Sequence, residues 1–156
     1  MGAGTLNDPY NLQRFVAAQE PEFEEVCSEL REGQKTGHWM WYIFPQIEGL
    51  GTSRLAQKFA ISSLEEATAY LEHPILGPRM RESARLVTLI TGRSAVQIFG
   101  HLDSLKFRSS MTLFTLTTPD NQVFKDALQK YFSGEFDTLT LEILSQRRPA
   151  DPLAQN

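Results

Sequence analysis

The chain has 156 residues, of which 41% are hydrophobic and 22% charged, and its formal net charge is -4 at pH 7. These values are typical of one soluble globular domain and exclude a disordered, collagen-like or coiled-coil chain. The longest apolar run, residues 39–44, is too short to cross a bilayer, and no secretion leader is apparent, so we expect a cytoplasmic protein. A single cysteine, Cys27, excludes an internal disulfide and a zinc site built from several cysteines.

Charge is distributed unevenly along the chain. Residues 20–32 carry six glutamates against one arginine, whereas residues 79–108 carry six basic residues against two acidic ones. Two interpretations stay open: two solvated helix faces that attract each other, or a basic segment that faces an anionic ligand. The sequence pI near 5.4 argues against binding to duplex nucleic acid, which needs a basic surface.

Apolar residues recur at three-four spacing through most of the chain, which predicts helices. The first two cover residues 12–19 and 23–30; Pro21 suits the first turn of the second helix, and Gly33 can end it. Residues 38–45 are either a buried strand or two turns of buried helix. We prefer the helix, because no second strand is apparent to pair with this segment.

Capping side chains mark the later helix starts, and glycines or prolines mark most of the ends. The predicted starts are Thr52 or Ser53, Ser63 with Glu66, Leu76, Ser94 with Gln97, Asp103, Val123 and Asp137. The predicted ends are about residue 61, His73-Pro74, Gly92, Gly100, about residue 117, Gly134 and Leu144. The sequence therefore predicts about eight short helices in one compact all-α domain over residues 10–145, with flexible termini at residues 1–9 and 146–156. The uneven helix lengths argue against a simple four-helix bundle.

Residues 49–53, Gly-Leu-Gly-Thr-Ser, form a loop that leads into a helix. Unpaired N–H groups at a helix start attract anions, and Gly49 and Gly51 would let a phosphate approach the backbone closely. No lysine follows the glycines, so the loop is not a P-loop, and a plain turn capped by Ser53 is the simpler interpretation. Glu48 is the only carboxylate at this loop and is therefore the candidate general base.

Both tryptophans of the chain lie in residues 38–44, immediately before this loop. On a helix, His38 shares a face with Trp41 and Tyr42, which would form an aromatic wall of a binding pocket with Gln46 close by. The alternative is core packing, which aromatic side chains dominate. His38 is a candidate for proton transfer, with a purely structural histidine as the alternative.

The predicted helix over residues 103–117 carries polar groups between two apolar stripes. The stripes are Phe107, Met111 and Phe114, and Leu105, Leu113 and Leu116. Lys106 and Ser110 lie together on one edge, where they would meet an anion or a carbonyl group. The alternative is an ion pair between Lys106 and Asp103 one turn away. Arg108 lies on the opposite edge and is a further candidate for ligand binding.

Other familiar catalytic patterns are absent from the sequence. The three histidines, His38, His73 and His101, are far apart and lack the spacing of metal ligands, so we expect no metal and no cofactor. No nucleophile-elbow pattern occurs. Cys27 lies on an apolar helical stripe, which indicates inert packing.

Several segments together resemble an uncharacterised family, domain of unknown function 1810, over about residues 8–145. They are residues 11–15 (NLQRF), 38–46 (HWMWYIFPQ), 49–51 (GLG), 73–79 (HPILGPR) and 103–114 (DSLKFRSSMTLF). The resemblance implies an all-helical single domain of a microbial cytosolic protein and implies no established activity. Members are sometimes labelled calpastatin, a disordered inhibitor, and this globular composition does not match that label.

Residues 56–59 (AQKF) and 65–67 (EEA) are similar to the lysine-bearing helix of the NADAR group, whose YbiA-like domains act on ADP-ribose linkages. This resemblance implies that a desolvated Lys58 attacks a sugar aldehyde and forms a Schiff base. An exposed surface lysine is the alternative.

Two hypotheses for the function follow. The first is a pocket for a small phosphorylated or nucleotide-like ligand, related to ADP-ribose, with walls from His38, Trp41, Tyr42 and residues 49–53 and with Lys106 and Ser110 beneath. If this pocket is catalytic, the expected reaction is hydrolysis at a glycosidic or phosphate-linked centre. His38 or Glu48 would move protons, and Lys106 would stabilise negative charge. The second is a non-enzymatic module that docks a protein through residues 20–32 or 79–93.

Overall fold

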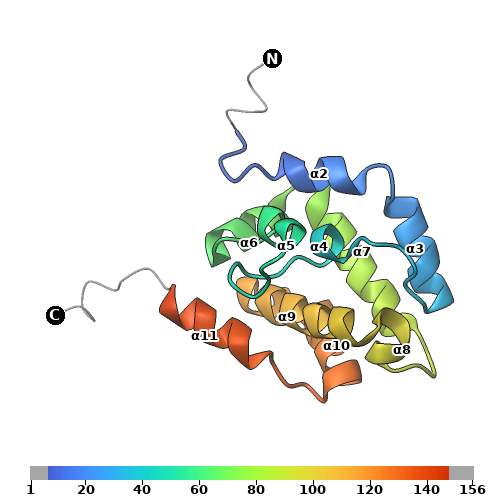
Figure 1. Cartoon of the computed structure of the whole chain (residues 1–156). Coiled ribbons are helices and arrows are strands. Elements are labelled where there is room, and N and C mark those ends of the chain that lie inside the picture. The colour runs from blue at the N-terminus through green and yellow to red at the C-terminus, as the bar shows by residue number, and fades with distance from the viewer. Residues whose placement is uncertain (1–6, 148–156) are drawn as a thin grey trace.

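The computed structural model describes residues 7–147, and in this part of the chain it contains ten helices (Figure 1). They are α2 (Gln13–Gln19), α3 (Phe23–Glu32), α4 (Met40–Ile43), α5 (Arg54–Lys58), α6 (Leu64–Glu72), α7 (Leu76–Leu89), α8 (Ala95–Phe99), α9 (His101–Thr117), α10 (Gln122–Phe132) and α11 (Thr138–Gln146). Seven of them have at least seven residues, and α4, α5 and α8 are shorter. The predicted all-α single domain is confirmed. None of these helices is both long enough and apolar enough to cross a membrane.

Helix α9 is the centre of the fold, and α10, α8, α6, α11 and α4 all pack against it. Figure 1 shows it crossing the middle of the molecule, with α4, α5 and α6 on one side and α11 on the other. Its stripe of Phe107, Met111 and Phe114 is fully buried, as the spacing predicts. The second predicted stripe is only partly buried: Leu113 is buried, but Leu105 and Leu116 are 48% and 41% exposed.

Local capping chemistry sets most helix ends. Ser94 and Gln97 form the complete predicted capping box of α8, and Asp137 accepts the Thr140 N–H at the start of α11. Gly33 ends α3 in the left-handed conformation (φ 78°), which glycine adopts without strain. Helix α9 begins at His101, two residues before the predicted start, so Asp103 lies in its first turn.

Other predicted boundaries are wrong. Residues 38–45 contain only the four-residue helix α4, with His38 and Trp39 outside it. Helix α5 ends at Lys58 rather than near residue 61, because Ile61 pairs with Ile47 in an isolated parallel bridge. Pro21 precedes α3 instead of lying in its first turn.

The termini and one more cap also differ from the prediction. Glu66 completes only half of the predicted capping box, because its carboxylate accepts from Ser62 instead of the Ser63 backbone. Of the predicted flexible termini, residues 1–6 and 148–156 lie outside the described residues. Asp8 lies within them, and its carboxylate accepts the backbone N–H groups of Leu12 and Gln13 at 2.7 and 3.0 Å, which fixes the start of α2.

The acidic and basic segments lie against each other, because α3 packs on α7. Arg79 of α7 forms an ion pair with Glu20 at 2.9 Å, and its guanidinium lies 5.0 Å from the Phe23 ring centroid. Cys27 is buried between these elements, and burial raises the pKa of its thiol, as expected for a cysteine that only packs. Part of the charge asymmetry is therefore used within the fold.

Candidate functional site

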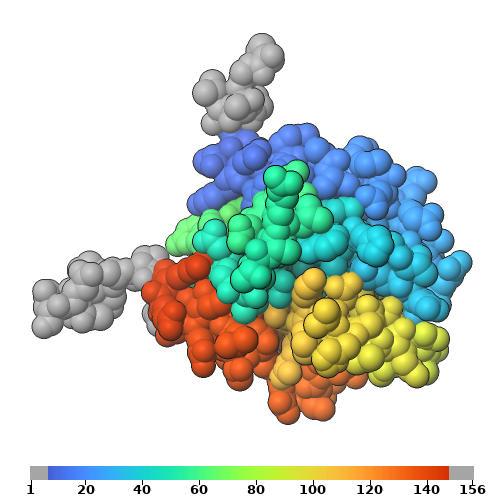
Figure 2. Space-filling model, in the orientation of Figure 1, coloured from blue at the N-terminus to red at the C-terminus, as the bar shows by residue number. Residues whose placement is uncertain are grey.

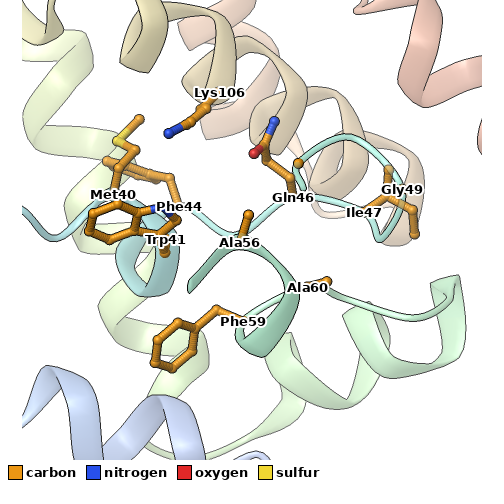
Figure 3. Close-up of a pocket in the computed structure, with 11 residues that line it drawn as sticks. Met40, Trp41, Phe44, Gln46, Ile47, Gly49, Ala56, Phe59, Ala60 and Lys106 are labelled. Carbon is orange, nitrogen blue, oxygen red and sulfur yellow. The ribbon is translucent and has the colours of Figure 1, made fainter. Parts of the chain in front are cut away.

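A small hollow lies where α4 and the glycine loop approach α9 (Figure 3). It is lined by Met40, Trp41, Phe44, Gln46, Ile47, Gly49, Gly51, Ala56, Phe59, Ala60 and Lys106. Five residues predicted for the site therefore gather here: Trp41, Gln46, Gly49, Gly51 and Lys106. The cavity volume is about 10 Å³, which is room for about one water molecule.

Lys106 brings a positive charge to this hollow from α9. Its ammonium lies 5.4 Å from the Trp41 ring centroid and 3.5 Å from Oδ1 of Asp103, and its side chain is 29% exposed. The predicted Lys106–Asp103 ion pair is thus present. The other oxygen of Asp103, Oδ2, lies 2.8 Å from the ammonium of Lys35. Two lysines therefore share one carboxylate. In the described part of the chain, neither ammonium lies within 4.0 Å of a second carboxylate.

Lys35 is held more firmly than Lys106. Its side chain is only 8% exposed, and its ammonium donates to the Gly37 carbonyl at 2.5 Å and lies 5.1 Å from the Trp39 ring centroid. Its backbone N–H donates to the Ile98 carbonyl, which ties the turn to α8. Asp103 is thus paired on one side with a nearly buried cation and on the other with a more exposed one.

A buried carboxylate on α3 positions the turn that leads into α4. Oε1 of Glu29 accepts the N–H groups of Thr36, Gly37 and the Trp39 indole at 2.8, 3.0 and 2.9 Å. Burial alone raises the pKa of Glu29, but the two backbone donors and the indole outweigh it, so the pKa lies below its usual value. Neither Glu29 nor Lys35 was among the predicted site residues. Helical spacing gives the signal for Glu29, since it lies three residues from Val26 on the apolar face of α3.

Arg14 fixes the opposite wall of the hollow. Its guanidinium donates to the carbonyls of Lys58 and Ala60, both at 2.8 Å, and to the Glu66 carboxylate at 2.9 Å. It also donates to two carbonyls at the start of α2. Arg14 therefore joins α2, the end of α5 and α6, and its role was not predicted.

Three predicted residues beside the hollow do not line it. His38 is exposed and lies before α4. The Tyr42 hydroxyl instead donates to Glu22 at 2.6 Å, and burial together with that carboxylate raises the pKa of Tyr42. Glu48 is exposed and lies 3.2 Å from Arg147. The hollow therefore has neither of the predicted proton-transfer groups, and no side chain that lines it is an imidazole or a carboxylate.

The remaining predicted residues have structural partners or lie elsewhere. The Ser53 hydroxyl accepts the Ala56 N–H, so this loop is a turn with a helix cap. Arg108 donates to the carbonyls of residues 135 and 136, on a different side of α9. Ser110 is fully buried, and its hydroxyl has no hydrogen-bond partner among the described residues. Lys58 is exposed, which leaves it without the desolvation that a Schiff-base nucleophile needs.

The glycine loop has a steric requirement that explains one of its glycines. A Cβ atom at Gly51 would lie 2.5 Å from the Cβ of Ala56, so only glycine fits where the loop passes α5. Gly49 has a φ of 110° and lies close to Ile143 of α11. The two glycines are therefore explained by the backbone conformation and close packing of the chain around the hollow.

These observations define a small all-helical domain with one lysine-bearing hollow at its surface. Residues 9–144 match the family described as "Protein of unknown function (DUF1810)", and the chain belongs to this family. Its structure is similar to the crystal structure of the conserved hypothetical protein Rv1873 from Mycobacterium tuberculosis, with a TM-score of 0.88 and 53% sequence identity, over 88% of this chain and 99% of that chain. No curated protein matches the sequence.

Proposed function

We propose that the hollow binds the anionic group of a small phosphorylated or nucleotide-like ligand. The observation that carries this proposal is the sharing of Asp103 between Lys35 and Lys106, because the three groups together keep one net positive charge. That charge lies beside the Trp41 ring and the Gln46 side chain, which also line the hollow. An anion at this position would receive a charge-assisted hydrogen bond from the Lys106 ammonium.

The size of the hollow limits how such a ligand binds. A cavity of about 10 Å³ accepts one oxygen-sized group and excludes a sugar or a base. The anionic group would therefore enter, and a planar ring would stack on the half-buried Trp41 outside. Stacking of a base on an aromatic side chain contributes about 1–3 kcal/mol.

The proposal is binding and assigns no reaction. Hydrolysis needs a group that moves a proton within hydrogen-bond reach of the ligand. His38 and Glu48 do not line the hollow, so the geometry supports Lys106 as an anion-binding residue and gives no support to an acid–base pair.

Thermal shift with AMP, ADP-ribose and inorganic phosphate tests the proposal. A probe at a hundredfold excess over its Kd should stabilise the wild type by about 2.7 kcal/mol. Lys106→Met should abolish that shift, and Lys125→Met, an exposed lysine on α10, should keep it. Inorganic phosphate should bind about ten-fold or more weakly than AMP, because it lacks the stacking ring. Absence of any shift in the wild type, or an unchanged shift in Lys106→Met, would overturn the proposal.

The second hypothesis, a docking module that uses residues 20–32 or 79–93, has weaker support. Glu29 is buried, Glu22 binds Tyr42 and Glu20 pairs with Arg79, so half of the acidic residues already have partners within the fold. Residues 79–93 retain exposed arginines, of which Arg85 pairs with Glu82. A partner that binds equally well to the Lys106→Met variant would favour this second function.

A further inference from the structure

One wall of the hollow is a loop closed at its base. The Ile47–Ile61 bridge brings the two ends of residues 48–60 together, with the Ile61 N–H donating to the Gln46 carbonyl at 2.9 Å and the Glu48 N–H to the Ile61 carbonyl at 2.8 Å. Between these ends lies α5, whose Ala56 faces the hollow across from Lys106 and Gln46 (Figure 3). In the space-filling view this segment lies at the surface, between α2 and α9 (Figure 2).

Inside this loop the hydrogen bonds are local. The Ala56 N–H donates to the Ser53 hydroxyl, the Gln57 N–H to the Ser53 carbonyl, and the Gln57 amide to the Thr52 carbonyl. Within residues 7–147, no hydrogen bond or ion pair joins residues 49–57 to any residue outside the 48–60 loop; the Phe59 and Ala60 N–H groups donate to the Leu55 and Gln57 carbonyls inside it. None of the five residues of α5 is buried.

The fastenings of the segment lie at its two ends. At one end, Arg14 binds the Lys58 carbonyl, and Phe59 is buried with its ring centroid 5.6 Å from that of Phe15. At the other end, Glu48 pairs with Arg147. The wall formed by α9, in contrast, is held in place by packing against five other helices. Segments with few buried apolar contacts open at a lower free energy than the core.

We propose that residues 49–57 form a lid that opens as a unit over the hollow, turning about its two ends, at Gly49 and at Lys58–Phe59. This inference rests on the proposed function in one respect: a hollow with room for about one water molecule admits more than one oxygen of the ligand's anionic group only after the lid moves. Opening requires no core side chain to leave its place, because Phe59 and Ile61 stay on the fixed side.

Thiol labelling measures the opening without any ligand. In a Cys27→Ala background, Met40→Cys places a thiol under the lid, and Met80→Cys is the matched control, because both methionines are 1% exposed and only Met40 lines the hollow. The Met40→Cys thiol should be labelled about ten-fold or more faster than the Met80→Cys thiol, with a rate that does not change at low denaturant. The free energy of opening obtained from the Met40→Cys labelling rate should be smaller than the free energy of unfolding of that variant. Because both values come from the same variant, a loss of stability caused by the substitution does not affect the comparison.

A second variant tests whether the lid is the moving part. Gly51→Ala puts a methyl group 2.5 Å from the Cβ of Ala56, so it should displace α5 and raise the labelling rate of Met40→Cys by several-fold, with that of Met80→Cys unchanged. Equal rates and equal denaturant dependence for the two thiols would overturn the lid. If the lid opens but AMP does not slow the labelling of Met40→Cys, the lid stands and the nucleotide proposal fails.

Discussion

Glu29→Gln is the substitution whose effect the structure defines most sharply. The carboxylate is 5% exposed, and Oε1 alone accepts three N–H groups at 2.8–3.0 Å. A hydrogen bond to a charged group contributes about 1.5–3 kcal/mol and one to a neutral group about 0.5–1.5 kcal/mol. Glutamine keeps the acceptor oxygen and loses the charge, which costs about 1 kcal/mol for each bond. We expect the free energy of unfolding to fall by about 2–3 kcal/mol at pH 7.

This loss should depend on pH with a definite sign. The pKa of Glu29 is lower in the folded protein than in the unfolded chain, where it is about 4.3. The unfolded chain therefore binds the proton first as pH falls, and the stabilisation present at neutral pH is lost as pH falls below about 4 through the folded pKa. The difference in unfolding free energy between the wild type and Glu29→Gln should accordingly shrink in acid.

Urea denaturation at several pH values between 7 and 3 measures both effects. Glu25→Gln is the matched control, because Glu25 is exposed on the same helix, and it should change stability by less than about 0.5 kcal/mol. If Glu29→Gln is as stable as Glu25→Gln, or if its deficit is the same at pH 3 as at pH 7, the assignment of Glu29 as a charged anchor is wrong.

Two further substitutions test the walls of the hollow. Arg14→Ala removes the ion-pair partner of the buried Glu66 carboxylate and should lower the free energy of unfolding by about 3–5 kcal/mol, measured by urea denaturation. A decrease of less than about 1 kcal/mol would show that Arg14 does not hold α2, α5 and α6 together. Asp103→Asn removes the carboxylate that Lys106 shares, so the affinity for AMP in a calorimetric titration should rise about two- to five-fold. Weaker binding would show that Asp103 holds Lys106 in place rather than competing with the ligand.

The helix ends that were predicted correctly depend on chemistry within four residues of the chain. Ser94 and Gln97 bond each other's backbone, and Asp137 bonds the N–H three residues later. Gly33 supplies a left-handed residue where α3 must stop. Such signals can be read from a sequence because both partners lie inside one short window.

The segment at residues 38–45 was misjudged because a distant residue decides its conformation. Periodicity alone predicts a helix through His38, but Glu29 binds the Trp39 indole and the two preceding turn amides, which keeps residues 36–39 out of a helix. In the same way, the spacing of Leu105 and Leu116 on α9 cannot indicate which side of a helix its neighbours cover. Tertiary contacts overrule local pattern in both cases.

The sequence predicted only the part of the candidate site that lies within one short stretch of chain. Trp41, Gln46, Gly49 and Gly51 lie within eleven consecutive residues, so any compact path of the chain keeps them near one another. Lys106 joins them because α4 packs on α9. The charge of the site depends on Lys35, which reaches Asp103 from the turn after α3, and no sequence pattern links those two positions.

The two ion pairs of Asp103 differ in distance and burial, and this difference bears on the proposed binding. Lys35 is nearly buried and lies 2.8 Å from the carboxylate, so the ion pair that the fold depends on is the one with Lys35. Lys106 is more exposed and lies 3.5 Å away, and ion pairs of that kind contribute about 0–1 kcal/mol. Under the proposed binding, Lys106 would therefore leave Asp103 at little cost, and Asp103 would keep Lys35 as its partner. An isolated Lys106–Asp103 pair would instead leave a carboxylate without its cation beside the incoming anion, which opposes binding.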